Sequence, residues 1–210
     1  MDRIIKGVMK YRKCHREGMV KQFQQVRDNP QPKAVFFTCM DSRMIPTRFT
    51  ETNVGDMFVV RNAGNIVPHS SHFMDELTMC EPAALELGCV VNDIRHIIIC
   101  GHSDCKAMNL LYALRDQEFA SQIVAYIDPE NRFAVEDKLS QVNTLQQLQN
   151  VASYGFLKKR LETHDLHIHA IWFDIYTGDI YYFSRAHKRF VEINELNETP
   201  ILKEIKTYYS

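Results

Sequence analysis

This sequence lacks the features that would point to a membrane, a nucleic acid or several domains. No uninterrupted apolar stretch approaches the roughly 20 residues that span a bilayer, and a formal net charge of −1 offers no electrostatic attraction to nucleic acid or anionic lipid. Internal repeats, low-complexity tracts and Gly/Ser linkers are also missing. The 210 residues, 45% of them hydrophobic and 24% charged, suit one globular domain with a sizeable core. We therefore expect a single domain, residues 1–210, with neither a nucleic acid nor a membrane among its partners.

A secretory signal is also missing ahead of the cysteines, so we expect reduced thiols in an intracellular compartment. The six cysteines are Cys14, Cys39, Cys80, Cys89, Cys100 and Cys105. Reduced thiols are available to bind metal. Basic residues outnumber acidic ones over residues 1–29, which leaves a mitochondrial transit peptide as a competing interpretation of this segment. The expected compartment is therefore the cytoplasm or the mitochondrion.

The same N-terminal segment spaces its apolar residues loosely as a helix does, with Arg and Lys between them. We interpret residues 1–29 as an amphipathic helical arm that belongs to the fold and packs on a partner subunit.

Further along, apolar runs typical of buried strands alternate with helical patterns. The strand-like runs cover residues 33–38, 57–62 and 94–102, and the helical patterns cover 72–91, 105–119 and 140–165. Residues 167–184 read as two strands joined by a turn that contains Thr177 and Gly178. These patterns predict an α/β fold, in which a mostly parallel central sheet is flanked by helices and followed by a C-terminal hairpin strand.

Chemistry-bearing residues follow two of these strands directly. The stretch "FFTCMDSRMIP" contains Cys39, Asp41 and Arg43, and "ICGHSDCKAM" contains His102 and Cys105. The carboxyl ends of parallel strands are where open α/β sheets form their sites. Zinc accepts two thiolates and one imidazole, and three protein ligands leave a fourth position open for water. Either motif alone is commonly a buried thiol or a chance spacing, but together they predict a catalytic zinc site.

The two residues that follow Cys39 at alternate positions have a chemical reason to be there. Asp41 is close enough to a metal at Cys39 to accept a hydrogen bond from bound water, or to ligate the ion itself. Arg43 carries a permanent charge and a forked set of donors, so it can hold that carboxylate in place and keep it ionised.

These motifs resemble the β-class carbonic anhydrases, whose signature pairs C-x-D-x-R with a later H-x-x-C. The resemblance continues through "VGDMFVVRNAGN" and "EPAALELGCVV" to the C-terminal hairpin, and it is strongest to animal members. It implies a lyase that uses Zn²⁺ to convert CO₂ reversibly to bicarbonate and a proton, as a homodimer or higher homo-oligomer. It also implies that Cys39, His102 and Cys105 bind the zinc, and that Asp41 and Arg43 form a catalytic dyad that orients zinc-bound hydroxide.

The resemblance extends less firmly to the substrate pocket and the proton path. It places Phe58, Ala63 and Leu87 where relatives line the CO₂ pocket, partly across a subunit boundary; the alternative is that all three are core residues. His69 and His72 are candidates for proton transfer because histidine titrates near neutrality, or they are solvated loop residues. The family usually carries a longer insertion where residues 118–130 run straight through, and we expect this shortening to affect packing or assembly without touching the zinc ligands.

Other functions fit these residues less well. A thiolate phosphatase needs C-x₅-R, but Ile45 stands six residues after Cys39, and no G-x-G-x-x-G follows a strand to bind a nicotinamide. Two alternatives stay open. One is a catalytically silent zinc protein in which Asp41 closes the site as fourth ligand, and the other is a hydrolase of a sulfur analogue of CO₂.

Overall fold

The computed structural model describes residues 1–72, 79–114 and 134–209. Its centre is a six-stranded sheet in the order β2-β1-β3-β4-β5-β6. The strands are β1 (Ala34–Cys39), β2 (Met57–Asn62), β3 (His96–His102), β4 (His167–Phe173), β5 (Ile180–Ser184) and β6 (Arg189–Glu192). The first four are parallel, and β5 and β6 are antiparallel to their neighbours. The predicted α/β fold with a mostly parallel sheet is confirmed, and so is the hairpin of β4 and β5.

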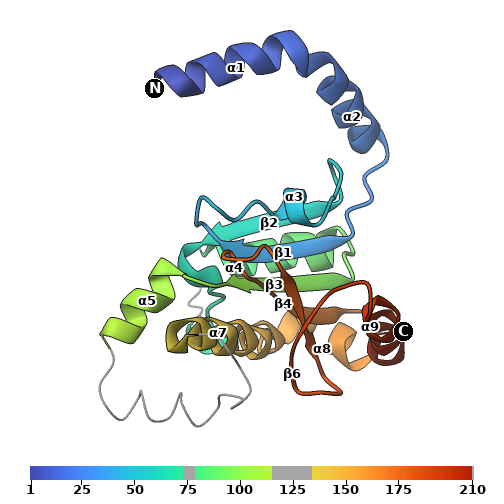
Figure 1. Cartoon of the computed structure of the whole chain (residues 1–210). Helices are drawn as coiled ribbons and strands as arrows, with labels where there is room; N and C mark the ends of the chain where they lie inside the picture. Colours follow the sequence, from blue (N-terminus) through green and yellow to red (C-terminus); the bar gives the residue numbers. More distant parts are fainter. Residues whose placement is uncertain (73–78, 115–133, 210) are drawn as a thin grey trace.

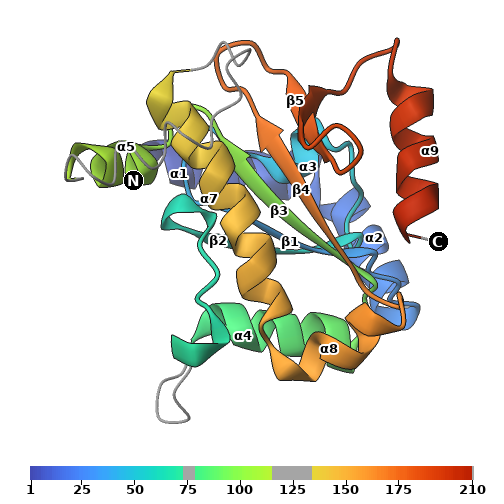
Figure 2. The same ribbon diagram turned by 90° about the horizontal axis from the view of Figure 1, so that it is seen from below.

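Helices cover one face of this sheet (Figure 2). They are α4 (Cys80–Leu85), α7 (Val135–Ala152) and α8 (Gly155–Glu162). In β1, Val35 and Phe37 point into the core that these helices share with the sheet, whereas Phe36 packs into a second core on the opposite face. There, Phe49 of α3 (Pro46–Phe49) stacks on Phe173 at a centroid distance of 4.8 Å. Because both faces are covered, β1 reads as a continuous apolar run.

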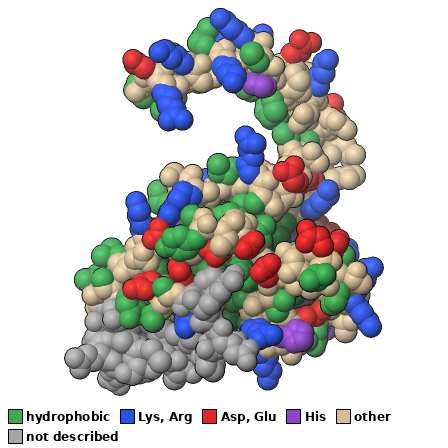
Figure 3. Space-filling model, viewed as in Figure 1, with side chains coloured by type: hydrophobic (Ala, Val, Ile, Leu, Met, Phe, Trp, Pro, Cys, Tyr) green, Lys and Arg blue, Asp and Glu red, His purple; other side chains and the backbone are tan. Residues whose placement is uncertain are grey.

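The N-terminal arm forms two helices, α1 (Asp2–Cys14) and α2 (Arg16–Asp28), which arch away from the sheet (Figure 1). Across these two helices, both fully described, no residue is buried. Basic and apolar side chains share the surface of the arm, and a wide hollow separates it from the body (Figure 3). The exposed apolar residues include Ile4, Ile5, Val8, Met9 and Phe23. The predicted helical arm is therefore present, as two helices.

The single helix predicted over residues 140–165 is wrong, because the chain forms α7 and α8 there with a break between them. Tyr154 leaves the helical region, with ψ near 115°, and its side chain is buried with the hydroxyl donating to the Pro68 carbonyl at 2.7 Å. Burial of one tyrosine thus overrides a local helical pattern.

The other helical patterns are confirmed in part. Of residues 72–91, the segment 73–78 lies outside the described residues, and the remainder forms α4 followed by a π-helical turn, η3 (Glu86–Val91). Gly88 allows this turn to lie against β1, since a Cβ there would overlap the Val35 side chain. Of residues 105–119, α5 (Lys106–Ala113) is described and positions from 115 onward are not. No sequence pattern predicted β6 or the C-terminal α9 (Glu198–Tyr209).

The strand order places the predicted site at a particular point of the sheet. From β1, the chain moves first to β2 on one side and then to β3 on the other, so the direction of winding reverses between β1 and β3. Loops that leave neighbouring strand ends in opposite directions open a crevice at the carboxyl edge. Within the described residues, no helix combines the length and apolar character that crossing a bilayer requires.

Candidate metal centre

Three predicted ligands meet at this reversal point. Cys39 ends β1, His102 ends β3, and Cys105 is the residue before α5. All three are buried, and one ligand atom from each lies within 4.8 Å of the others. The two sulfurs are 3.9 Å apart, too far for a disulfide but close to the separation of about 3.8 Å that two Zn–S bonds of about 2.3 Å make at a tetrahedral angle.

The imidazole of His102 is prepared as a ligand through its Nε2 atom. Its Nδ1 lies 2.7 Å from the Ser103 carbonyl, which can only accept, so Nδ1 carries the ring proton. The other nitrogen, Nε2, is buried and has no hydrogen-bond partner among the described residues. A buried acceptor without a partner costs about 1–3 kcal/mol, and a metal ion would remove that cost. A backbone carbonyl that fixes the tautomer is the usual support of a metal-bound histidine.

The two thiols are set up to lose protons to a metal. The pKa of Cys39 is lowered, first by the hydrogen bond from the Cys105 thiol and then by His102, against the opposing effect of burial. The Gly64 N–H also points at the Cys39 sulfur, at 3.4 Å. The pKa of Cys105 is raised because its proton is shared with Cys39. One negative charge is thus already stabilised between the sulfurs, and a divalent ion stabilises the second.

Among the described residues, the remaining cysteines do not form such a pair of thiols beside an imidazole. Burial raises the pKa of Cys89 to about 11 and that of Cys100 to about 12, so both are protonated. Cys14 and Cys80 are exposed and free. Within the described parts of the chain, Cys39, His102 and Cys105 form the group of side chains that can converge on a metal.

Asp41 and Arg43 form a close ion pair beside this group. Arg43 donates from Nε to Asp41 Oδ1 at 3.0 Å and from Nη2 to Oδ2 at 2.8 Å, and its backbone N–H donates to Oδ1 at 3.0 Å. These bonds hold the pKa of the Asp41 carboxyl well below its usual range. The side chain of Asp41 is 9% exposed, and its carboxylate is not part of the group of converging ligand atoms.

Comparison with known proteins identifies the family. The carbonic anhydrase family model matches residues 34–180. Beta carbonic anhydrase 1 of Caenorhabditis elegans is 44% identical over 254 aligned residues, which cover 100% of this chain and 94% of the relative. The chain belongs to the β-class carbonic anhydrases. The carbonic anhydrase of Synechocystis is 32% identical, over 86% of this chain and 70% of that one.

Solved structures agree with the family. The β-carbonic anhydrase CcaA superposes with a TM-score of 0.76 at 30% identity, covering 93% of this chain and 92% of that chain. This carbonic anhydrase therefore uses zinc, and the residues present fit it: two paired thiols, and one imidazole nitrogen with no other partner. The alignment with the nematode relative spans more positions than this chain has residues, so the relative carries residues missing here. The segment predicted to be shortened, 118–130, lies outside the described residues.

The predicted pocket residues of this carbonic anhydrase differ in their exposure. Phe58 packs against the core beneath α4, Ala63 is exposed at the start of a short turn, and Leu87 is 52% exposed. Phe58 thus behaves as the core alternative expects, whereas Ala63 and Leu87 do not. Their role in binding CO₂ stays a prediction.

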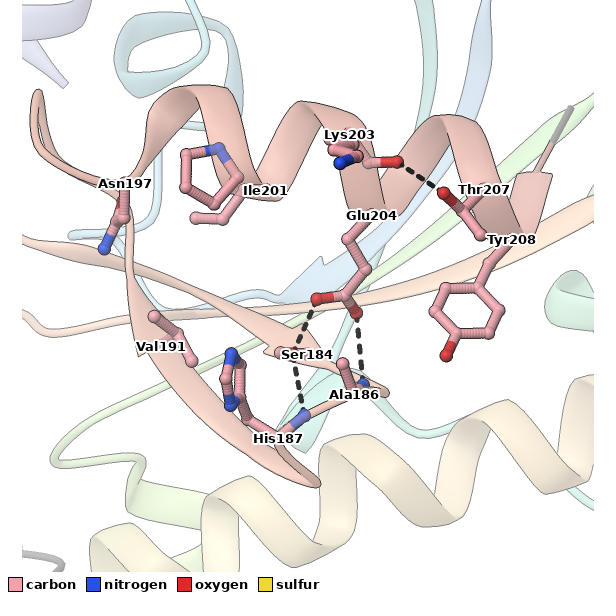
Figure 4. A pocket seen from close by; sticks show the side chains of 11 residues that line it. Ser184, Ala186, His187, Val191, Asn197, Ile201, Lys203, Glu204, Thr207 and Tyr208 are labelled. Carbon is pink, nitrogen blue, oxygen red and sulfur yellow. Dashed lines mark hydrogen bonds between the residues drawn. The ribbon is translucent and has the colours of Figure 1, made fainter.

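Two cavities formed by described residues lie away from these three side chains. One, of about 360 Å³, separates α9 from β5 and β6, where Glu204 accepts hydrogen bonds from Ser184 and Ala186 (Figure 4). The other, of about 470 Å³, borders Asp104 and Asp137. Neither is lined by Phe58, Ala63 or Leu87.

The candidate proton carriers lie in an exposed loop. His69 and His72 are both exposed, and His69 Nδ1 is 2.9 Å from Ser71 Oγ. Their proton-transfer role stays a prediction beside the solvated alternative.

Sequence reasoning missed two residues that hold the site together. Arg61 of β2 donates to the Cys39 carbonyl at 3.1 Å and to the Asp41 carbonyl at 2.6 Å. Asp104 binds Arg43 from the opposite loop. The sequence feature that could have indicated Asp104 is its position between the two predicted ligands in "HSDC".

Proposed function

We propose that this carbonic anhydrase hydrates CO₂ reversibly with Asp41 and Arg43 as the dyad that orients the reacting water. CO₂ hydration follows from the family, and the observation that supports the dyad is the two-pronged Asp41–Arg43 pair beside the buried Cys-His-Cys group. Zinc, when bound, acts as a Lewis acid and lowers the pKa of water well below its bulk value of about 15.7.

The chain's own residues then have distinct tasks. Asp41 stays ionised next to Arg43, so its carboxylate accepts a hydrogen bond from the water and sets the direction of the oxygen lone pair. Arg43 directs its Nε and Nη2 donors at the two oxygens of this carboxylate. Orientation of this kind raises the rate because it is established before CO₂ arrives.

Stopped-flow CO₂ hydration with Arg43→Ala and Arg43→Lys tests the dyad. We expect zinc content near one per chain and a fall in kcat of about 10- to 100-fold, the usual effect of removing a group that orients a metal site. Lysine should not restore the rate, because its ammonium lacks the rigid planar fork that binds the two carboxylate oxygens side by side. Full activity of a folded, zinc-loaded Arg43→Ala protein would remove the dyad from the mechanism.

The same assay separates the alternatives. A zinc-loaded wild-type chain that leaves CO₂ unhydrated from pH 6 to 9 would indicate the silent, closed site. Carbonyl sulfide and carbon disulfide are assayed alongside, and turnover of either one without CO₂ hydration would indicate the sulfur-analogue hydrolase.

We also propose that the chain functions as a homodimer or larger homo-oligomer. The support is the arm: none of its residues 2–28 is buried, and several of its apolar side chains are exposed. A solved β-carbonic anhydrase of Sordaria macrospora, with a TM-score of 0.67 at 21% identity over 86% of this chain and 96% of that one, is described as tetrameric. Analytical ultracentrifugation of the full chain tests this. Ile5→Asp with Val8→Asp should shift it toward monomer, and a monomeric wild type would contradict the proposal.

A further inference from the structure

Arg43 is shared between two carboxylates, only one of which belongs to the dyad. While Nε and Nη2 bind Asp41, Nη1 donates to Asp104 Oδ2 at 2.7 Å and Nη2 also donates to the Asp104 carbonyl at 3.0 Å. Asp104 lies in the loop between the ligands His102 and Cys105. The guanidinium therefore bridges the loop after β1 to the loop that carries the other two ligands.

Asp104 is itself held firmly. Its backbone has φ near +50°, a left-handed conformation that Asp and Asn tolerate better than most residues. Its N–H donates to Oδ1 of the buried Asp137 at 2.6 Å, and its own Oδ1 accepts from Asn109 Nδ2 at 3.1 Å. One carboxylate oxygen is thus fixed by α5, which leaves the other directed at Arg43.

The bridge supplies a restraint that the dyad lacks. Asp41 and Arg43 are two residues apart on one loop, so their pairing fixes each to the other but not to His102 or Cys105. The Arg43 side chain is 37% exposed, and an isolated ion pair at such a site contributes only about 0–1 kcal/mol. The contacts with Asp104 cross 61 residues of sequence and tie the pair to the loop of His102 and Cys105.

We propose that Asp104 is a positioning residue, which acts through Arg43 to hold the Asp41 carboxylate in its orientation toward the metal ligands. This inference rests on the proposed role of the dyad. It does not require Asp104 to touch substrate or metal. A displacement of about 1 Å at a reacting group can cost about 100-fold in rate, so a side chain that fixes Arg43 can affect turnover.

Asp104→Asn tests the inference without straining the backbone, because Asn tolerates the same left-handed φ. It removes the charge and replaces one carboxylate oxygen with an amide nitrogen, so the side chain no longer offers an acceptor to both Arg43 and Asn109. We expect one zinc per chain, an unchanged KM, and a kcat reduced about 10-fold or more, since an interaction that matters for the reacting geometry lowers kcat and kcat/KM together. The matched control is Asp93→Asn. Asp93 also has φ near +50° and pairs with an arginine, Arg160, at 2.8 Å, but it lies outside the site. It should leave kcat unchanged.

A double-mutant cycle shows whether Asp104 acts through Arg43. In the Arg43→Ala background, Asp104→Asn should lower kcat no further, because the group through which it acts is gone. An equal loss in both backgrounds would overturn the inference, and so would a wild-type rate for Asp104→Asn or a loss of zinc from that variant. If Arg43→Ala itself has the wild-type rate, the dyad fails; if only Asp104→Asn does, the dyad stands and the positioning role fails.

Discussion

Gly101 allows β3 to lie against α7 immediately before the predicted ligand His102, and Gly101→Ala should destabilise the protein. A Cβ at this position would overlap Thr144 Oγ1 and lie 3.1 Å from Trp172 Cδ1 and 3.3 Å from the Ser140 carbonyl. The residues around it are buried, so there is no free space into which they can move. Overpacking of this kind costs about 1–3 kcal/mol. At about 2–4 °C per kcal/mol for a chain of this size, the melting temperature should fall by about 2–12 °C.

Thermal unfolding of zinc-loaded protein, followed by circular dichroism, measures this change. Gly155→Ala is the control, because a Cβ at Gly155 meets nothing within 4 Å and should leave the melting temperature unchanged or slightly higher. Thr144→Ala removes the overlapping oxygen, at the cost of its bond to the Ser140 carbonyl. The double variant Gly101→Ala/Thr144→Ala should therefore be less destabilised than the two single effects added together. A Gly101→Ala protein that melts with the wild type, or strictly additive effects, would refute the reasoning.

Three further predictions concern stability. Ser140→Ala removes the donor to the His102 carbonyl and an acceptor of Trp172 Nε1, and should cost about 1–3 kcal/mol in urea unfolding; no change in midpoint would contradict this. Burial, followed by the charges of His96 and His167, lowers the pKa of His169 to about 3. Below pH 6.5 this histidine is therefore protonated in the unfolded chain but not in the folded protein, so the folded protein loses stability as the pH falls. Between pH 7 and 5 the free energy of unfolding should fall by about 2 kcal/mol for this reason, and His169→Phe should make it depend less on pH in urea unfolding. The same pH dependence in the variant and the wild type would disprove this role of His169. Chelation of zinc should abolish CO₂ hydration and lower the melting temperature, because zinc at 1,000 times its Kd stabilises the folded state by about 4 kcal/mol. A melting temperature that changes neither on chelation nor on zinc addition would argue against the site.

Where the sequence pattern succeeded, the signal was local. Val35, Phe36 and Phe37 are all buried because both faces of β1 are covered, and this is what makes the strand readable as an apolar run. The convergence of the predicted ligands could be foreseen for a similar reason, since Cys39 and His102 each end a strand and parallel strands share one edge.

The elements that the sequence pattern did not predict depend on long-range packing. The break between α7 and α8 depends on burial of Tyr154 against the Pro68 loop, 86 residues away. The strand β6 carries a weak pattern, because none of its residues is fully buried.

By itself, the sequence determined which side chains stand together at strand ends and predicted that they carry the chemistry: two thiols, an imidazole and an Asp-Arg pair. Within each motif the spacing is short enough for local geometry to bring these side chains together. Only the tertiary structure decided how the subsets meet. The reversal of strand order between β1 and β3 places Cys39 beside Cys105 and brings Asp104 within 2.7 Å of Arg43. Contacts across more than 60 residues depend on which strands are neighbours, and that is decided by packing of the whole sheet and not by any local pattern.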